Sequence, residues 1–102
     1  MIQDTINNVR AWGADKGITG PNGKATGPTQ FGKTLEEIEE LSVAIEAEYL
    51  PEIKDAIGDT TVTLILLAER YGLTFEECLE WAYNVISQRT GKMVDGVFVK
   101  DK

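Results

Sequence analysis

Apolar residues return every three or four positions in four separate segments of the chain, and this periodicity constrains the fold more than any other feature. Such spacing places the apolar side chains on one face of an α-helix. It predicts amphipathic helices over residues 2–16, 30–48, 51–71 and 74–86. The third is apolar on almost all sides, so we expect it to be the most buried. The sequence therefore predicts an all-α, four-helix bundle-like domain over residues 1–102.

Helix-terminal residues mark where these segments begin. Thr34 with Glu37 has the spacing of a capping box, in which the two side chains satisfy free backbone amides at a helix start. Thr74 with Glu77 repeats this spacing before the fourth segment. Pro51 suits the first turn of the third helix, where an amide hydrogen is not needed. The second helix begins either at about Gln30 or at Thr34, the first residue of its capping box.

Two segments lack helical periodicity. Residues 17–29 hold four glycines and two prolines, a composition that breaks helices and strands alike. A loop of this length is either a lid or binding segment, or disordered. In the tail, residues 92–102, Asp95-Gly96 lies between short apolar pieces and is the dipeptide of a tight hairpin turn. The tail is therefore either a small β-ribbon or a loose arm.

Composition restricts the class of protein. The 102 residues fit one domain, and a core this small favours a homo-oligomer, either a dimer or a tetramer. Seventeen acidic residues against ten basic ones give a net charge of -7, which argues against a nucleic-acid partner. The single cysteine, Cys78, excludes an internal disulfide and a cysteine-rich zinc site. No apolar run approaches the ~20 residues that span a bilayer, so we expect no membrane partner and a cytoplasmic location, in the host cytoplasm if phage-encoded.

The acidic residues are concentrated between Thr34 and Glu80, which contain 13 of the 17. At about 100° per residue, Glu37 and Glu40 lie roughly 60° apart at the border of the buried face of the second helix. On the third helix, three acids fall within roughly 60° of one another: Glu52, Asp55 and Asp59. Carboxylates this close repel unless a cation neutralises them. We therefore expect a Mg²⁺ site between the two helices, because Mg²⁺ prefers oxygen ligands and commonly joins carboxylates to substrate phosphates.

Motifs in the same region resemble those of a known family. The run Glu36-Glu37-Ile38-Glu39-Glu40 matches an EExxE pattern, and Gly58-Asp59 follows on the next helix. Four further matches flank these motifs: Gln30, Lys33, Asn84 and Arg89. With these residues the chain resembles the MazG-like all-α nucleoside triphosphate pyrophosphohydrolases, which include small bacteriophage members.

The resemblance implies a reaction and a role for each of these residues. The reaction is the hydrolysis of a nucleoside triphosphate to a monophosphate and pyrophosphate with Mg²⁺, or with Mn²⁺ in its place. Three acids would hold the metal: Glu37, Glu40 and Asp59. Either Glu36 or Asp55 would orient the attacking water. The four flanking residues would bind the substrate: Gln30, Lys33, Asn84 and Arg89. Lys92 is a further candidate, because a triphosphate has oxygens that the metal does not neutralise.

One position departs from the family pattern and keeps a second function open. Ala56 stands where the ExxD motif of the family has its glutamate. Asp55 or Glu52 can replace that ligand, because both lie closer than Ala56 in helical angle to Asp59. With fewer ligands, the chain would instead be a non-catalytic helical module that binds a protein partner or a nucleotide.

Overall fold

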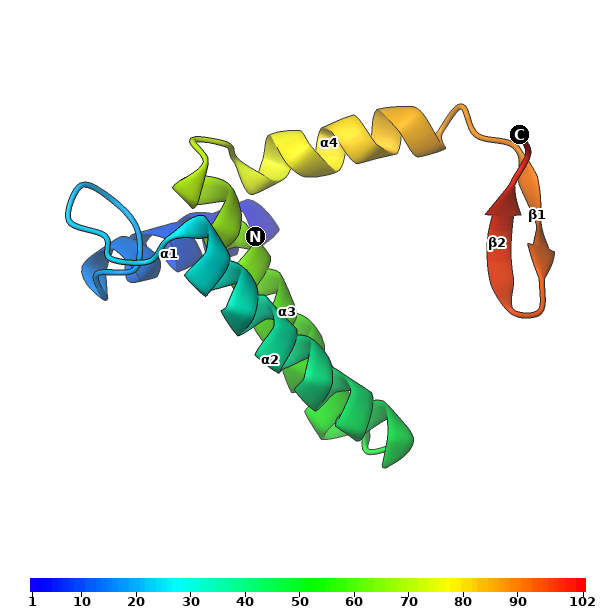
Figure 1. Ribbon diagram of the computed structural model, residues 1–102, viewed down its shortest axis with the longest axis horizontal. Helices are drawn as coiled ribbons and strands as arrows, with labels where there is room; N and C mark the ends of the chain where they lie inside the picture. Colours follow the sequence, from blue (N-terminus) through cyan, green and yellow to red (C-terminus); the bar gives the residue numbers. More distant parts are fainter.

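The protein contains four α-helices and one small antiparallel sheet (Figure 1). The structure, a computed structural model, describes residues 1–102. Its elements in chain order are α1 (Ile2–Asp15), α2 (Gly27–Glu46), α3 (Leu50–Arg70), α4 (Phe75–Ile86), β1 (Gly91–Val94) and β2 (Val97–Lys100). This order confirms the predicted helical class and the C-terminal ribbon.

α2 and α3 form an antiparallel hairpin that contains most of the core (Figure 1). The turn between them is tight, and Glu48 adopts a positive φ of 53° there. Ala44 of α2 and Ile65 and Leu66 of α3 are among the most buried side chains of the chain. α3 holds more buried residues than any other helix, as its apolar pattern predicted.

α1 packs across α3 (Figure 1). The close approach requires a glycine at position 13, because a β-carbon on Gly13 would collide with the side chain of Leu66. The loop that follows is closed by backbone hydrogen bonds, one of which runs from the Lys24 amide to the Gly17 carbonyl oxygen over 2.9 Å. The predicted loop over residues 17–29 is therefore present, except that its last three residues form the first turn of α2.

α2 begins at Gly27, earlier than either start predicted from the sequence. Thr26 caps it, and its hydroxyl accepts a hydrogen bond of 3.1 Å from the amide three residues later. Thr34 lies inside the helix, where its hydroxyl donates to the carbonyl oxygen four residues earlier over 3.2 Å. The predicted capping box of Thr34 and Glu37 is therefore wrong, because Thr26 supplies the cap and both of those residues are buried within the helix.

The apolar face of α2 is not the face that packs on α3. Leu35, Ile38 and Ile45 recur at the helical spacing that predicted this helix, yet they are 50%, 46% and 56% exposed. The buried residues of α2 are mostly polar: Gln30, Thr34, Glu37 and Ala44. Periodicity located the helix correctly but did not identify which of its faces meets its neighbour.

α4 and the hairpin form an arm, residues 75–102, that extends away from the other three helices (Figure 1). The predicted capping box starts α4, with the Thr74 amide donating to Glu77 Oε1 over 2.8 Å and the Glu77 amide donating to the Thr74 hydroxyl over 3.1 Å. Asp95 and Gly96 have φ values of 50° and 82°, as a two-residue hairpin turn requires. No residue of α4, β1 or β2 is buried. The four helices therefore do not close into a bundle within one chain.

None of the helices combines the length and apolar character that crossing a bilayer requires.

Candidate functional site

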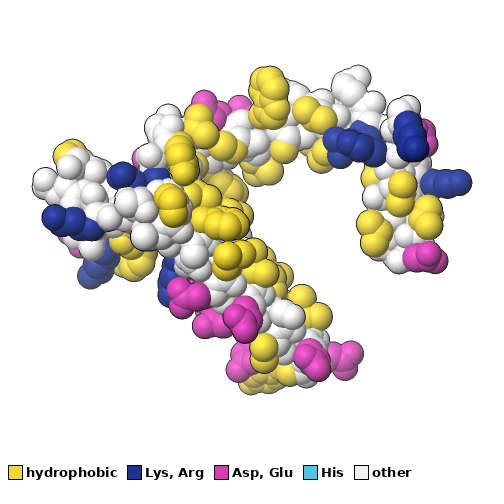
Figure 2. Space-filling model, in the orientation of Figure 1, with side chains coloured by type: hydrophobic (Ala, Val, Ile, Leu, Met, Phe, Trp, Pro, Cys, Tyr) yellow, Lys and Arg dark blue, Asp and Glu magenta, His cyan; other side chains and the backbone are white.

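The α2–α3 hairpin has two chemically different sides, one on either side of the line where the helices touch. Because positions turn by about 100° per residue, the acids of both helices fall on one of these sides. This acidic side carries Glu36, Glu40, Glu52, Asp55 and Asp59. The opposite, apolar side carries Phe31, Leu35, Ile38, Ile45, Ile57 and Leu64. Figure 2 shows this division, with acidic side chains along one edge of the hairpin and hydrophobic ones along the edge that faces the arm.

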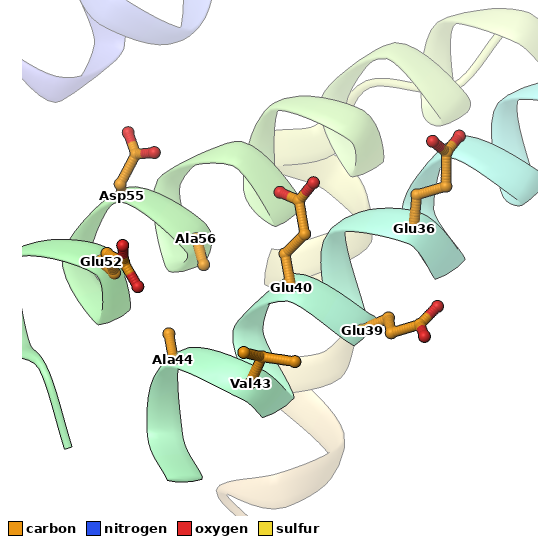
Figure 3. A pocket seen from close by; sticks show the side chains of 8 residues that line it. All are labelled: Glu36, Glu39, Glu40, Val43, Ala44, Glu52, Asp55 and Ala56. Atoms are coloured by element: carbon orange, nitrogen blue, oxygen red, sulfur yellow. The ribbon is translucent and has the colours of Figure 1, made fainter. Parts of the chain in front are cut away.

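An open pocket of about 560 Å³ lies on the acidic side, between α2 and α3 (Figure 3). The side chains of Glu36, Glu40 and Asp55 extend toward the same side of it. Ala44 and Ala56 face each other between the helices, and their small side chains leave the space that the pocket occupies. Its volume falls within the ~300–1,000 Å³ of small-molecule sites.

Glu37 is the one acid of the EExxE motif that is buried, with 8% of its surface exposed. Its Oε2 atom has no hydrogen-bond partner, and its Oε1 atom lies 3.7 Å from Lys33 Nζ. Burial raises the pKa of Glu37, hydrogen bonding and repulsion with Glu40 raise it further, and Lys33 opposes the increase. A buried carboxylate with an unpaired oxygen is unfavourable unless a cation compensates it.

Asp59 connects the acids of α3 to Glu37. Burial raises the pKa of Asp59, and the charges of Asp55 and then Glu37 raise it further. Asp55 and Asp59 also line a second hollow, of about 840 Å³, between α1, α3 and the start of α4. The other walls of that hollow are largely apolar and include Ile6, Val62 and Phe75. Asp55 therefore lies where the acidic pocket meets the apolar hollow, whereas Asp59 lines the hollow alone.

The chemistry of this donor set fits a hard divalent cation. All the ligands available are carboxylate oxygens, which Mg²⁺ prefers. The unpartnered oxygen of Glu37 and the raised pKa values of Glu37 and Asp59 indicate negative charge that the protein itself leaves uncompensated. No three such side chains converge tightly enough here to enclose an ion by themselves. Any ion held here would need water or substrate oxygens to complete its coordination shell.

Ala56 is 5% exposed and forms part of the floor of the acidic pocket. Position 56, where the family pattern has a glutamate, therefore lies at the pocket that the other acids line. Glu52 and Asp55, the two substitutes considered, both line the same pocket. Which of them acts as a ligand stays a prediction.

The predicted substrate-binding residues fall into two separate groups. Gln30 is buried and its side-chain amide donates to the Thr63 carbonyl oxygen over 3.2 Å, which ties α2 to α3. Lys33 stands beside the acids, 3.8 Å from Glu36 Oε1. The remaining three lie on the exposed arm, away from the acidic pocket: Asn84, Arg89 and Lys92. Within one chain, only Lys33 is placed to reach a ligand in that pocket.

Sequence reasoning assigned no role to two residues of the pocket, Glu39 and Ala44, or to Arg10, which lies outside it. Glu39 lines the pocket, although Figure 3 shows its carboxylate pointing away from those of Glu36 and Glu40. Ala44, one helical turn after Glu40, was detectable from that spacing as a small residue on the acidic side. Arg10 links three helices through ion pairs to α3 and α4, and no local pattern marks it.

The comparisons with known proteins yield one relative from a bacteriophage. The chain is 32% identical over 69 residues to the uncharacterized 18.2 kDa protein of the rep-hol intergenic region of Haemophilus phage HP1 (strain HP1c1). The matched segment covers 68% of this chain and 40% of that protein, so the chain spans less than half the length of this relative. No family profile and no solved structure matches the chain.

Proposed function

We propose that the protein is a MazG-like nucleoside triphosphate pyrophosphohydrolase, which converts a nucleoside triphosphate to a monophosphate and pyrophosphate with Mg²⁺. The observation that carries the proposal is the buried, unpartnered carboxylate oxygen of Glu37 among the acids of α2 and α3. Such a group favours a bound cation, and Mg²⁺ sites in proteins commonly serve phosphate chemistry. The adjoining apolar hollow has the volume for the nucleoside part of the substrate.

Each side chain has a role that follows from its position. Glu37, Glu40 and Asp59 would hold Mg²⁺ or Mn²⁺, with Asp55 as a further ligand. The metal would supply charge neutralisation of the phosphates and polarisation of the phosphorus–oxygen bond. Glu36 or Asp55, both facing the pocket, would orient a water molecule and accept its proton. Lys33 would donate to a phosphate oxygen at the rim.

The same proposal includes a homo-oligomer that completes the bundle. Asn84, Arg89 and Lys92 can take part in substrate binding only if the arm of another copy brings them to the pocket. Homo-oligomerisation would also cover the apolar side of the hairpin, whose side chains a single chain leaves in water.

One observation favours a non-catalytic alternative. Ala56 occupies the pocket floor without a carboxylate, so the site has one ligand fewer than the family pattern. In that case the chain would bind a nucleotide, or a protein partner, without hydrolysing it.

The test is incubation of the purified protein with Mg²⁺ and a panel of canonical and modified nucleoside triphosphates. We expect monophosphate and pyrophosphate in equal amounts, because cleavage falls between the α and β phosphates. Orthophosphate as the product, or no cleavage with either Mg²⁺ or Mn²⁺, would refute the hydrolase proposal.

Two substitutions test whether hydrolysis and Mg²⁺ binding depend on the acidic pocket. Glu40→Gln keeps the shape of the side chain and removes one charge, and should reduce turnover by at least about tenfold and weaken Mg²⁺ binding. Asp101→Asn makes the same chemical change on the arm and should leave both unchanged. Asp55→Asn should match Glu40→Gln in Mg²⁺ affinity if Asp55 replaces the missing glutamate.

A further inference from the structure

The chain exposes far more surface than a compact protein of its mass. Its accessible surface is 7824 Å² for 11.2 kDa, whereas a folded monomer of that mass exposes about 5,700 Å². Its radius of gyration is 15.9 Å, against about 13 Å for a compact domain of this length. The excess is about 2,000 Å² per chain, which is the amount that each partner of a large, obligate homodimer interface buries.

Two unpartnered surfaces account for much of this excess. One is the apolar side of the α2–α3 hairpin, where Ile38 is 46% and Ile57 is 53% exposed. The other is the apolar stripe of α4, formed by Phe75, Leu79, Ala82 and Ile86. None of its residues is buried, and Ile86 is 52% exposed. Figure 2 shows hydrophobic side chains along both inner edges of the angle between α4 and the hairpin. The chain therefore has one apolar helix face that no other element buries, and one apolar surface on which no helix packs.

The two surfaces cannot meet within one chain because the start of α4 is clamped. Arg10 of α1 pairs with Glu69 of α3 and with Glu76 in the first turn of α4. Its second guanidinium nitrogen donates to Glu76 Oε2 over 2.6 Å, and the Gln3 amide donates to the same carboxylate over 2.6 Å. These bonds fix the direction in which α4 leaves the body, away from the hairpin. A second copy of the chain can cover each of these two apolar surfaces.

We infer that the protein forms a two-fold homodimer in which α4 of each copy packs on the apolar side of the α2–α3 hairpin of the other. This arrangement is self-complementary, as a closed two-fold interface must be. It also agrees with the distribution of charge. The segment after α4, residues 87–102, has four basic and two acidic residues, whereas residues 27–70 have ten acidic and three basic ones. The basic tail of each copy would therefore lie against an acidic body.

The inference deepens the homo-oligomer of the proposed function and is independent of hydrolysis, so it is tested by mass and not by activity. Sedimentation velocity of the full chain at micromolar concentration should give twice 11.2 kDa. Ile86→Lys places a charge on the α4 stripe, and Ile38→Glu places one on the apolar side. Each substitution alone should shift the protein to the monomer mass, because a charge would be buried in the interface.

Two matched controls make comparable changes outside the interface. Glu80→Lys places the same lysine on the polar face of α4, and Val43→Glu adds the same acid to α2 on the acidic side. Both should remain dimers. Either control becoming monomeric together with its interface variant would show that the loss is not specific to the surfaces named.

Mixing the two interface variants decides whether α4 meets the hairpin. In the mixed dimer, the Ile86→Lys position of one copy faces the Ile38→Glu position of the other, so the two new charges are opposite. The second half of the interface is unchanged. We therefore expect the equimolar mixture to recover the dimer mass and full helical circular dichroism, even if each variant alone is partly unfolded. A monomeric wild type, a dimer insensitive to both substitutions, or a mixture that stays monomeric would overturn the inference.

Discussion

At the residue scale, Glu37 is maintained in an unfavourable environment. Its carboxylate is nearly buried, one oxygen has no partner, and Glu40 lies beside it. The Lys33 ammonium at 3.7 Å is half exposed and only partly offsets these effects. A raised carboxyl pKa means that the folded state binds the proton more tightly than the unfolded state. The free energy of unfolding therefore falls as pH rises from the ordinary value of 4.5 through the raised one.

Replacing Glu37 with glutamine should therefore stabilise the metal-free protein. At pH 7 we expect Glu37→Gln to raise the free energy of unfolding by on the order of 1 kcal/mol, which is about 4–8 °C in the thermal midpoint of a domain this size. At pH 4 the difference should shrink, because the wild-type side chain is then protonated. Thermal melts followed by circular dichroism measure both values.

Glu39→Gln is the matched control, since Glu39 is exposed on the same helix and should give no such gain. Addition of Mg²⁺ should raise the midpoint of the wild type and have little effect on Glu37→Gln. A Glu37→Gln variant less stable than the wild type at pH 7 would contradict this account of the site.

At the element scale, the direction of α4 depends on a small polar cluster. Arg10 and Gln3 of α1 both bind the carboxylate of Glu76, and these hydrogen bonds lower the pKa of Glu76 to about 2. Arg10 also pairs with Glu69, so α1, α3 and α4 meet at one guanidinium. The capping box at Thr74 then starts α4 immediately after a short turn. The arm is thus positioned by a few polar contacts, without buried apolar packing along α4.

Lowering the pH should weaken the ion pair between Arg10 and Glu76 over a defined pH range. Because the pKa of Glu76 is depressed in the folded state, its stabilising contribution is complete above 4.5 and is lost as pH falls toward 2. The difference in free energy of unfolding between the wild type and Glu76→Gln should therefore be largest near pH 5 and smallest near pH 2. Urea unfolding at a series of pH values measures it.

Glu80→Gln removes a carboxylate of α4 that makes no ion pair, and serves as the control. Its difference from the wild type should not follow the same pH dependence. If the Glu76→Gln difference were constant between pH 5 and pH 2, the ion pair with Arg10 would not stabilise the fold.

At the scale of the whole molecule, the balance of buried and exposed apolar side chains is unusual for an isolated chain. Five apolar residues form the core, whereas 24 large apolar residues are exposed. Some of the latter are ordinary surface residues, but those of α4 and of the apolar side form continuous stripes. A core of this size gives little stability alone, so association should supply part of the free energy of folding.

The thermal midpoint should therefore depend on protein concentration. For a dimer that dissociates as it unfolds, each tenfold increase in concentration adds about 1.4 kcal/mol per dimer. We expect the midpoint to rise by several degrees between about 1 µM and about 100 µM protein. Ile86→Lys, which is expected to be monomeric, should melt at a midpoint that does not change with concentration. A concentration-independent wild type would contradict dimer-coupled folding.

The sequence by itself determined the features that depend on local interactions. Four helices follow from the spacing of apolar residues, the start of α4 from Thr74 and Glu77, and the hairpin turn from Asp95-Gly96. In each case the residues that decide the structure lie within a few positions of one another. The acidic character of one side of the hairpin was also predictable, because Glu36, Glu40 and Asp55 keep a fixed angular relation on their own helices.

Only the tertiary structure decided how those elements meet. α2 begins after Thr26 because Thr26, and not Thr34, caps the helix. Spacing alone does not rank two candidate caps. The apolar stripe around Ile38 is left uncovered because α2 packs on α3 through Ala44 and polar residues, and periodicity does not say which partner covers a face. Asn84, Arg89 and Lys92 are far from the acids because Arg10, distant in sequence, fixes the direction of α4. Local patterns determine helices and turns, whereas contacts between distant residues determine which surfaces remain for a ligand or a second copy.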